Sequence, residues 1–126
     1  MSIESWKKEF YPCKADSKKA QKDPVGHSLQ KWIGLLPKNM QRHKVLHTAG
    51  SLYIIDKSDC FMAIIGDTCT LCMYFARCNS CSLYKTLHRK CYGVNSEYSK
   101  WICKNNPKPM IKALEKTKKK EIQHVH

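Results

Sequence analysis

Apolar residues recur at helical spacing in the segment that begins at Asp23. Four of them lie at relative positions i, i+3, i+4 and i+7 and form one face of a helix: Leu29, Trp32, Ile33 and Leu36. Asp23 followed by Pro24 is typical of a helix start, because the carboxylate can cap free amide groups and proline suits the first turn. His27 and Lys31 fall off the apolar face of this predicted helix.

Between residues 52 and 65 the pattern changes to short β-branched and aromatic runs. Residues 52–56 and 60–65 are interpreted as the two arms of a β-hairpin, joined by the polar turn 57–59. Further short helices are predicted at about 37–43, 67–75, 82–88, 96–104 and from 109 onwards. The sequence therefore predicts a small α+β domain in which several short helices surround one hairpin.

The two ends of the chain are polar and rich in lysine. Residues 1–22 include Trp6, Phe10 and Tyr11, which we expect to pack on the domain from a short helix or an extended arm. Past residue 116 the apolar periodicity fades. We therefore divide the chain into an N-terminal basic and aromatic arm (1–22), a central α+β domain (23–116) and a basic C-terminal tail (117–126).

The charge of the chain narrows the class of partner. Its 126 residues include 23 Lys and Arg against 10 Asp and Glu, which gives a formal net charge of +13. This balance excludes strongly basic partners and favours an acidic one, namely nucleic acid, an anionic membrane surface or an acidic protein patch. Because 20 of the basic residues are Lys, we expect contacts to phosphate with little reading of base edges. The residues predicted to touch this partner are Lys7, Lys8, Lys112, Lys116, Lys118, Lys119 and Lys120.

Neither a membrane span nor an export signal is expected from the sequence. The longest apolar run, at 61–65, is far shorter than the roughly 20 residues that a spanning helix needs. Residues 1–8 lack the apolar segment of a signal peptide. We therefore expect a cytoplasmic protein without a membrane partner. In such a reducing compartment, the eight cysteines are better explained by metal binding than by disulfides.

Five of the eight cysteines cluster within 23 residues of the chain. Cys69 and Cys72 form one CxxC pair, Cys78 and Cys81 form the next, and Cys91 follows. A CxxC pair can present two thiolates to one ion, and two pairs supply the four thiolates that structural Zn²⁺ prefers. Because the spacer between the pairs is short, Cys91 is an alternative to one of these four. The sequence predicts a zinc site that staples the hairpin to the helices after it.

Other interpretations of the cysteines stay open. Cys60 could replace one zinc ligand. The series Cys60, Cys69, Cys72 and Cys78 is also similar to the pattern that holds a [4Fe–4S] cluster in endonuclease III-type DNA glycosylases, although the first gap is longer here. The thiols could alternatively be buried without a ligand, or be paired in disulfides.

The histidines offer weaker candidates for chemistry. His43 and His47 lie four residues apart and could chelate a metal, but no Glu lies between them as in the HExxH motif. His88 is close to Cys91 in sequence, and a reactive thiol would need that imidazole beside it in space. With only ten acids, the chain also has little material for a carboxylate-based nuclease site.

Three stretches of the chain carry a resemblance to known proteins. They are the string SWKKEFYP at 5–12, the string HSLQKWIGL at 27–35, and the cysteine block that is followed by YSKW at 98–101. In this combination the chain resembles small uncharacterised phage and prophage proteins over most of its length. The resemblance implies a phage-type or mobile-element origin, a location in the host cytoplasm, and a role in handling host machinery or defence.

Together these features predict a non-catalytic zinc-binding module that presents a Lys-rich surface to an acidic partner, with nucleic acid preferred. One alternative is a phage-encoded inhibitor or adaptor that binds a host protein, such as a defence or nucleic-acid-processing enzyme. A second alternative is an iron–sulfur or metal-dependent enzyme that processes DNA.

Overall fold

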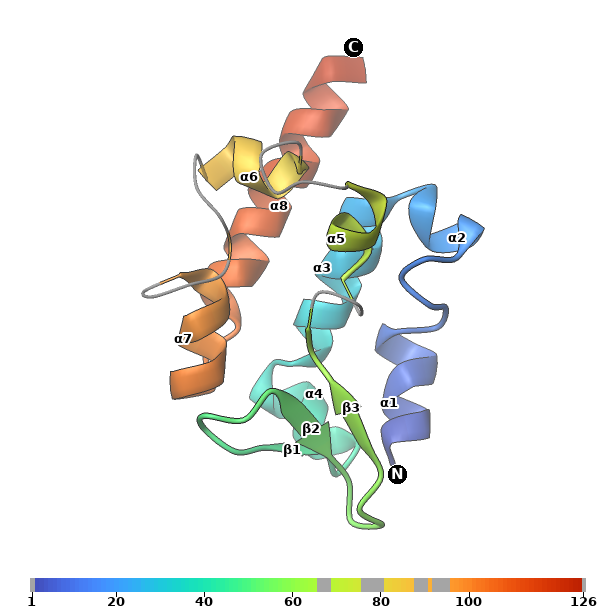
Figure 1. The fold of residues 1–126 in the computed structure, drawn as a ribbon, viewed down its shortest axis with the longest axis vertical. Coiled ribbons are helices and arrows are strands. Elements are labelled where there is room, and N and C mark those ends of the chain that lie inside the picture. The colour runs from blue at the N-terminus through green and yellow to red at the C-terminus, as the bar shows by residue number, and fades with distance from the viewer. Residues whose placement is uncertain (1, 66–68, 76–80, 88–90, 92–95, 126) are drawn as a thin grey trace.

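A central helix and a small sheet organise the fold (Figure 1). The computed structural model describes residues 2–65, 69–75, 81–87, 91 and 96–125, and over these residues the chain is an α+β domain. The helices are α1 (Ile3–Phe10), α2 (Lys18–Gln21), α3 (Pro24–Gly34), α4 (Pro37–Arg42), α5 (Thr70–Tyr74), α6 (Ser82–Leu87), α7 (Glu97–Lys104) and α8 (Lys108–Val125). The strands β1 (Leu46–His47), β2 (Tyr53–Ile55) and β3 (Phe61–Ala63) form one antiparallel sheet in that order.

The helix predicted after Asp23 is α3, and it lies at the centre of the structure. The carboxylate of Asp23 caps it by accepting a hydrogen bond from the amide of Gly26 at 3.0 Å. Helix α3 contacts α1, α2, α4, α5 and α8. It therefore buries more than its most apolar stripe, and His27 and Lys31 are only 8% and 1% exposed. Both residues lie off the apolar stripe, but neighbouring helices cover that side of α3 as well.

The predicted hairpin is confirmed as strands β2 and β3. Tyr53 pairs with Ala63, and Ile55 pairs with Phe61. Asp56 closes the turn, since its Oδ1 accepts hydrogen bonds from two amides of the turn, at 2.9 and 3.1 Å. Strand β1 was not predicted; it pairs with β2 and extends the hairpin to a three-stranded sheet. At two residues, β1 is too short to produce a recognisable alternating pattern.

The N-terminal segment packs its aromatic side chains into the core. Trp6 and Phe10 of α1 are 0% and 6% exposed, and Tyr11 packs against the same core. The indole Nε1 of Trp6 donates a hydrogen bond to the carbonyl of Gly34 at 2.9 Å. This contact joins α1 to the end of α3. The prediction that these aromatic residues pack on the domain is confirmed.

The C-terminal helices begin close to the predicted positions. Ser96 caps α7, and Asn105 ends it in the left-handed conformation. Helix α8 continues to Val125, so most of the predicted tail at 117–126 is helical. Within it, the buried hydroxyl of Thr117 lies within hydrogen-bond distance of the Thr86 hydroxyl, at 2.7 Å, and of the Ala113 carbonyl, at 2.8 Å. No helix among the described residues is long and apolar enough to cross a membrane.

Replacing Gly34 by alanine tests how closely α1 approaches α3. A Cβ atom at this position would lie 2.5 Å from Cγ and 2.6 Å from Cβ of Phe10, which is closer than packed atoms tolerate. We expect Gly34→Ala to lower the free energy of unfolding by about 1–3 kcal/mol, as for other overpacked cores. The loss is measured by urea denaturation.

The double variant with Phe10→Ala provides the control for this prediction, because alanine lacks Cγ and the ring. If the clash is the cause, Gly34→Ala costs less in the Phe10→Ala background than in the native protein. Strictly additive losses in the two backgrounds would contradict the predicted contact.

Candidate functional site

Three of the five predicted cysteine ligands line one cavity. Cys69, Cys72 and Cys91 surround a cavity of about 380 Å³ that is also lined by residues of α3, α7 and α8. Cys69 is the cap residue of α5, and Cys72 lies in the same helix. Cys81 directly precedes α6 and is half-buried against the core. Thiols from separate parts of the segment 69–91 therefore gather beside α3.

Cys69 and Cys72 form a hydrogen-bonded pair of sulfur atoms. The hydrogen bond from the Cys72 thiol holds the pKa of Cys69 well below its ordinary value, and the Lys31 ammonium adds to this effect while burial opposes it. The same hydrogen bond, together with burial and the nearby Cys91 and Cys81, raises the pKa of Cys72. The pair therefore favours a thiolate on Cys69 and a thiol on Cys72. The Ser28 hydroxyl lies 3.7 Å from the Cys69 sulfur.

A buried lysine accompanies the thiols. Lys31 lines the same cavity, and its Nζ lies 5.7 Å from the centre of the Trp32 ring. Burial lowers the pKa of Lys31, while Cys69, Cys72 and Cys91 act in the opposite direction. Sequence patterning missed this residue, because a lysine beside an apolar stripe normally points to solvent. Its place in the cavity gives the thiols a cationic neighbour.

The remaining predicted ligands are placed less favourably. Cys78 lies outside the described residues, as do His88 and the expected cap at 67–68 of the predicted helix 67–75. Cys60 is exposed in the turn between β2 and β3 and does not line the cavity. The described part of the chain has no three His, Cys, Asp or Glu side chains arranged to hold a metal ion, and its seven cysteines form no disulfide. The thiols share a cavity without converging on one point.

The predicted lysines fall on two separate surfaces. Lys7 and Lys8 belong to α1, whereas the others belong to α8, and α3 lies between these helices in Figure 1. Lys118 is engaged in an ion pair with Asp23, with 3.1 Å between Nζ and Oδ2. Lys120 is half-buried.

One face of α8 carries a row of exposed lysines. Lys112, Lys116 and Lys119 are exposed, and Lys108 at the start of the helix lies in line with them. The spacing of four, four and three residues keeps all four on one side of an α-helix over roughly 16 Å. Lys108 has the same spacing from Lys112 in the sequence, but it was not placed on this helix because the helix was predicted to begin at residue 109. We call these four residues the α8 lysine row.

Hydrogen bonds join α1 to α4 through Ser5, His43 and Glu9. His43 Nδ1 lies 2.9 Å from Ser5 Oγ, and its Nε2 lies 2.7 Å from Glu9 Oε1. Arg42 donates to both oxygens of the same Glu9 carboxylate at 2.7 Å. Although these side-chain types also occur in catalytic triads, Ser5 Oγ donates to the carbonyl of Ser2 and accepts from its amide. The hydroxyl belongs to the capping box of α1, which assigns this network a structural role.

His43 and His47 do not act as a chelating pair in the structure. His47 stacks on the Trp101 ring with 3.9 Å between ring centroids, and its Nε2 lies 2.7 Å from the carbonyl oxygen of Ser51. His43 is engaged with α1 as described above. Each imidazole therefore has its own polar partners, and the spacing of four in the sequence does not bring the two rings to one site.

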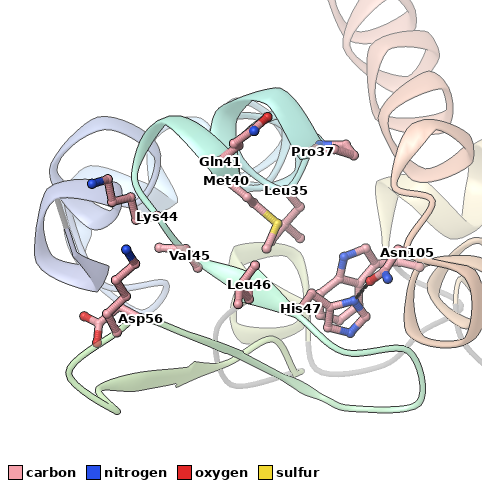
Figure 2. A pocket seen from close by; sticks show the side chains of 12 residues that line it. Leu35, Pro37, Met40, Gln41, Lys44, Val45, Leu46, His47, Asp56 and Asn105 are labelled. Atoms are coloured by element: carbon pink, nitrogen blue, oxygen red, sulfur yellow. Dashed lines mark hydrogen bonds between the residues drawn. The ribbon is translucent and has the colours of Figure 1, made fainter.

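A second cavity of about 560 Å³ lies between α4 and β1 (Figure 2). Its lining is largely apolar and includes Met40, Val45 and Leu46. Figure 2 shows Lys44 toward one end of this cavity and His47 toward the other. Sequence analysis did not predict it, because its lining residues come from parts of the chain that are far apart in sequence.

Comparison with known proteins adds no family to this description. No protein family model matches the sequence, and neither a curated protein nor a solved structure matches it significantly. The interpretation of both cavities and of the lysine row therefore depends on their own geometry.

Substituting Glu9 by glutamine tests the α1–α4 network. The hydrogen bonds from Arg42 and then His43 lower the pKa of Glu9 from 4.5 to about 2. A carboxylate with a lowered pKa stabilises the fold above its unfolded-state pKa, and this contribution is lost as the pH falls through the folded-state value. We expect the stability of the native protein to decline from about pH 4.5 to 2 more steeply than that of Glu9→Gln, measured by urea denaturation in EDTA.

Glu4→Gln is the matched control for this prediction, because Glu4 is an exposed acid of the same helix. It should leave the pH dependence close to that of the native protein. Identical pH profiles for Glu9→Gln and the native protein would contradict the proposed role of the network.

Proposed function

We propose that the protein is a non-catalytic zinc-binding module that presents a lysine-rich surface to nucleic acid. The gathering of Cys69, Cys72 and Cys91 around a cavity that also holds the buried Lys31 supports the metal part of the proposal. Thiolates are the ligands that structural zinc prefers, and a four-thiolate zinc site carries a net charge of about −2. A buried ammonium group beside such a site offsets part of that charge.

The proposed ligand set is Cys69, Cys72 and Cys91, completed by Cys81 or Cys78. Cys81 is close enough to raise the pKa of Cys72, and Cys78 belongs to the same CxxC pair. Zinc would supply a fixed centre that draws the thiols together, and its binding energy would be folding energy for the segment 69–91. Two residues of α3, Ser28 and Lys31, would lie beside the zinc ligands and contribute one hydroxyl and one cation.

The α8 lysine row supports the nucleic-acid part of the proposal. Four exposed ammonium groups on one helical face match the charge of a phosphate backbone, and binding would release the counterions condensed on it. Lysine carries no rigid fork for guanine edges, so this surface would hold the backbone with little preference for sequence. Such binding weakens steeply as the salt concentration rises.

Metal analysis tests the zinc site. We expect protein purified without air to contain about one zinc per chain and to show no visible absorption, whereas a [4Fe–4S] cluster would be coloured. Cys69→Ser and Cys91→Ser should lose the zinc. Cys103→Ser is the matched control, because Cys103 is exposed on α7, away from the cavity lining.

Removing the metal with EDTA should also destabilise the segment 69–91. Its backbone amides should then exchange hydrogen faster. Protein that contains neither zinc nor iron would contradict the metal site. Zinc that is retained equally by all three serine variants would contradict the ligand set.

Neutralising the α8 lysine row tests the nucleic-acid surface. A random DNA duplex is titrated at several salt concentrations, and affinity is measured by fluorescence anisotropy. If all four ammonium groups contact phosphates, their replacement by glutamine should lower the slope of log K against log salt by about 3 to 4. The variant carries Lys108→Gln, Lys112→Gln, Lys116→Gln and Lys119→Gln.

A variant with the same loss of charge elsewhere is the control, namely glutamine at the exposed positions Lys14, Lys18, Lys19 and Lys22. It should leave most of the slope in place. Equal losses in the two variants would indicate non-specific attraction to the net charge. Failure of the native protein to bind at low salt, together with one tight stoichiometric protein partner, would instead favour the inhibitor or adaptor hypothesis.

A further inference from the structure

The exposed face of the sheet carries a row of apolar side chains. The strand register places Leu46, Ile55 and Phe61 side by side across β1, β2 and β3. Their exposed fractions are 69%, 36% and 62%. Residues of the opposite face, such as Ile54 and Met62, are buried in the core. The sheet therefore covers the core with one face and presents large apolar groups to solvent with the other.

Two aromatic rings stand on this exposed face. Tyr53 is 47% exposed, and its ring centroid lies 5.3 Å from that of Phe61 at an interplanar angle of 90°. The partner of Tyr53 in the register is the small residue Ala63. Exposed aromatic rings on a sheet or groove are the usual supports on which proteins stack unpaired bases.

Two basic residues flank the strands of this sheet. Lys44 precedes β1 and Lys57 follows β2; both are exposed and line the cavity of Figure 2. Asp59 in the β2–β3 turn offsets one of these charges, whereas Asp56 is buried and accepts hydrogen bonds from three backbone amides. The cavity opens to the sheet at Leu46, which lines it and is largely exposed.

The cavity also leads toward the α8 lysine row. Asn105 lines its far end, and Lys108, the first lysine of the row, follows three residues later. Three residues span at most about 10 Å. The cavity therefore includes Leu46 of the sheet face in its lining and comes, at Asn105, within about 10 Å of the backbone of Lys108.

From this arrangement we infer that the exposed face of the sheet binds the unpaired bases of single-stranded nucleic acid by stacking on Phe61 and Tyr53. The inference rests on the proposed nucleic-acid function and names its substrate class. The unpaired bases of a single strand can stack on the two rings, and its phosphates can pair with the lysines. Bases inside a duplex are already stacked on one another, so they cannot occupy these rings.

Substitution of Phe61 tests the inference with a labelled oligo(dT) strand and a random duplex, by fluorescence anisotropy. Phe61→Ala should weaken single-strand binding by about 5- to 150-fold, the range expected for one lost stacking contact. Phe61→Leu should weaken it similarly, because leucine keeps an apolar surface but has no ring. Phe61→Trp should retain the affinity. Duplex binding and the salt slope should not change in any of the three.

Tyr74→Ala is the matched control, because Tyr74 is a comparably exposed aromatic residue, on α5. It should bind the single strand as the native protein does. Thermal unfolding of each variant verifies that it remains folded. An unchanged affinity in Phe61→Ala and Tyr53→Ala, with a loss only in the variant of the α8 lysine row, would overturn the inference and leave the proposed function standing.

Two further outcomes are distinct from this one. If the native protein binds neither strand nor duplex at low salt, the proposed function fails together with the inference. If sedimentation shows a dimer that Phe61→Ala dissociates and Phe61→Leu preserves, the face is an interface between two copies of the chain, and the inference is overturned.

Discussion

The burial of Lys31 on the central helix is the constraint on which the candidate metal site depends. An amine that is 1% exposed has lost its water, and this costs free energy unless anionic or polar groups face it. Cys69, Cys72 and Cys91 are groups that act on it electrostatically. Because α3 also packs against α1, α5 and α8, the whole core fixes the position of this amine. The cysteine cavity is therefore an extension of the core, and a change in either one acts on the other.

Strong local signals in the sequence were sufficient to predict much of the fold. The cap at Asp23, the polar hairpin turn at 57–59 and the cap at Ser96 were all recognisable, because each depends on residues close together in the chain. The same holds for the aromatic residues of α1, whose size and spacing indicated packing. The metal-ligand candidates were also identified locally, through the CxxC spacing, and three of them do line one cavity.

Features that depend on contacts between distant segments could not be predicted. Lys31 is buried because α5 and α8 cover a side of α3 that its own sequence marks as polar. Strand β1 forms because it pairs with β2. Its two residues are too few to show an alternating pattern in the sequence. The row of Leu46, Ile55 and Phe61 requires the register of three strands, because Ile55 and Phe61 lay in predicted hairpin arms and Leu46 lay in no predicted element. The sequence pattern of the hairpin arms therefore did not indicate that one apolar face of the sheet is exposed.

The cysteine cavity lies behind both proposed partner surfaces. Ile64 and Ile65, which follow β3, line it, and so does Met110 near the start of α8. Tyr98 ties the two sides together, because its hydroxyl donates to the carbonyl of Ile64 from α7. A metal that draws the thiols together would thereby fix the end of the sheet relative to the first turn of α8, where the lysine row begins. Since metal binding of this kind contributes folding energy, the proposed zinc would order the stacking face and the phosphate-binding face as one surface without touching either. On this view the cysteines determine whether the basic charge of the chain forms a defined site.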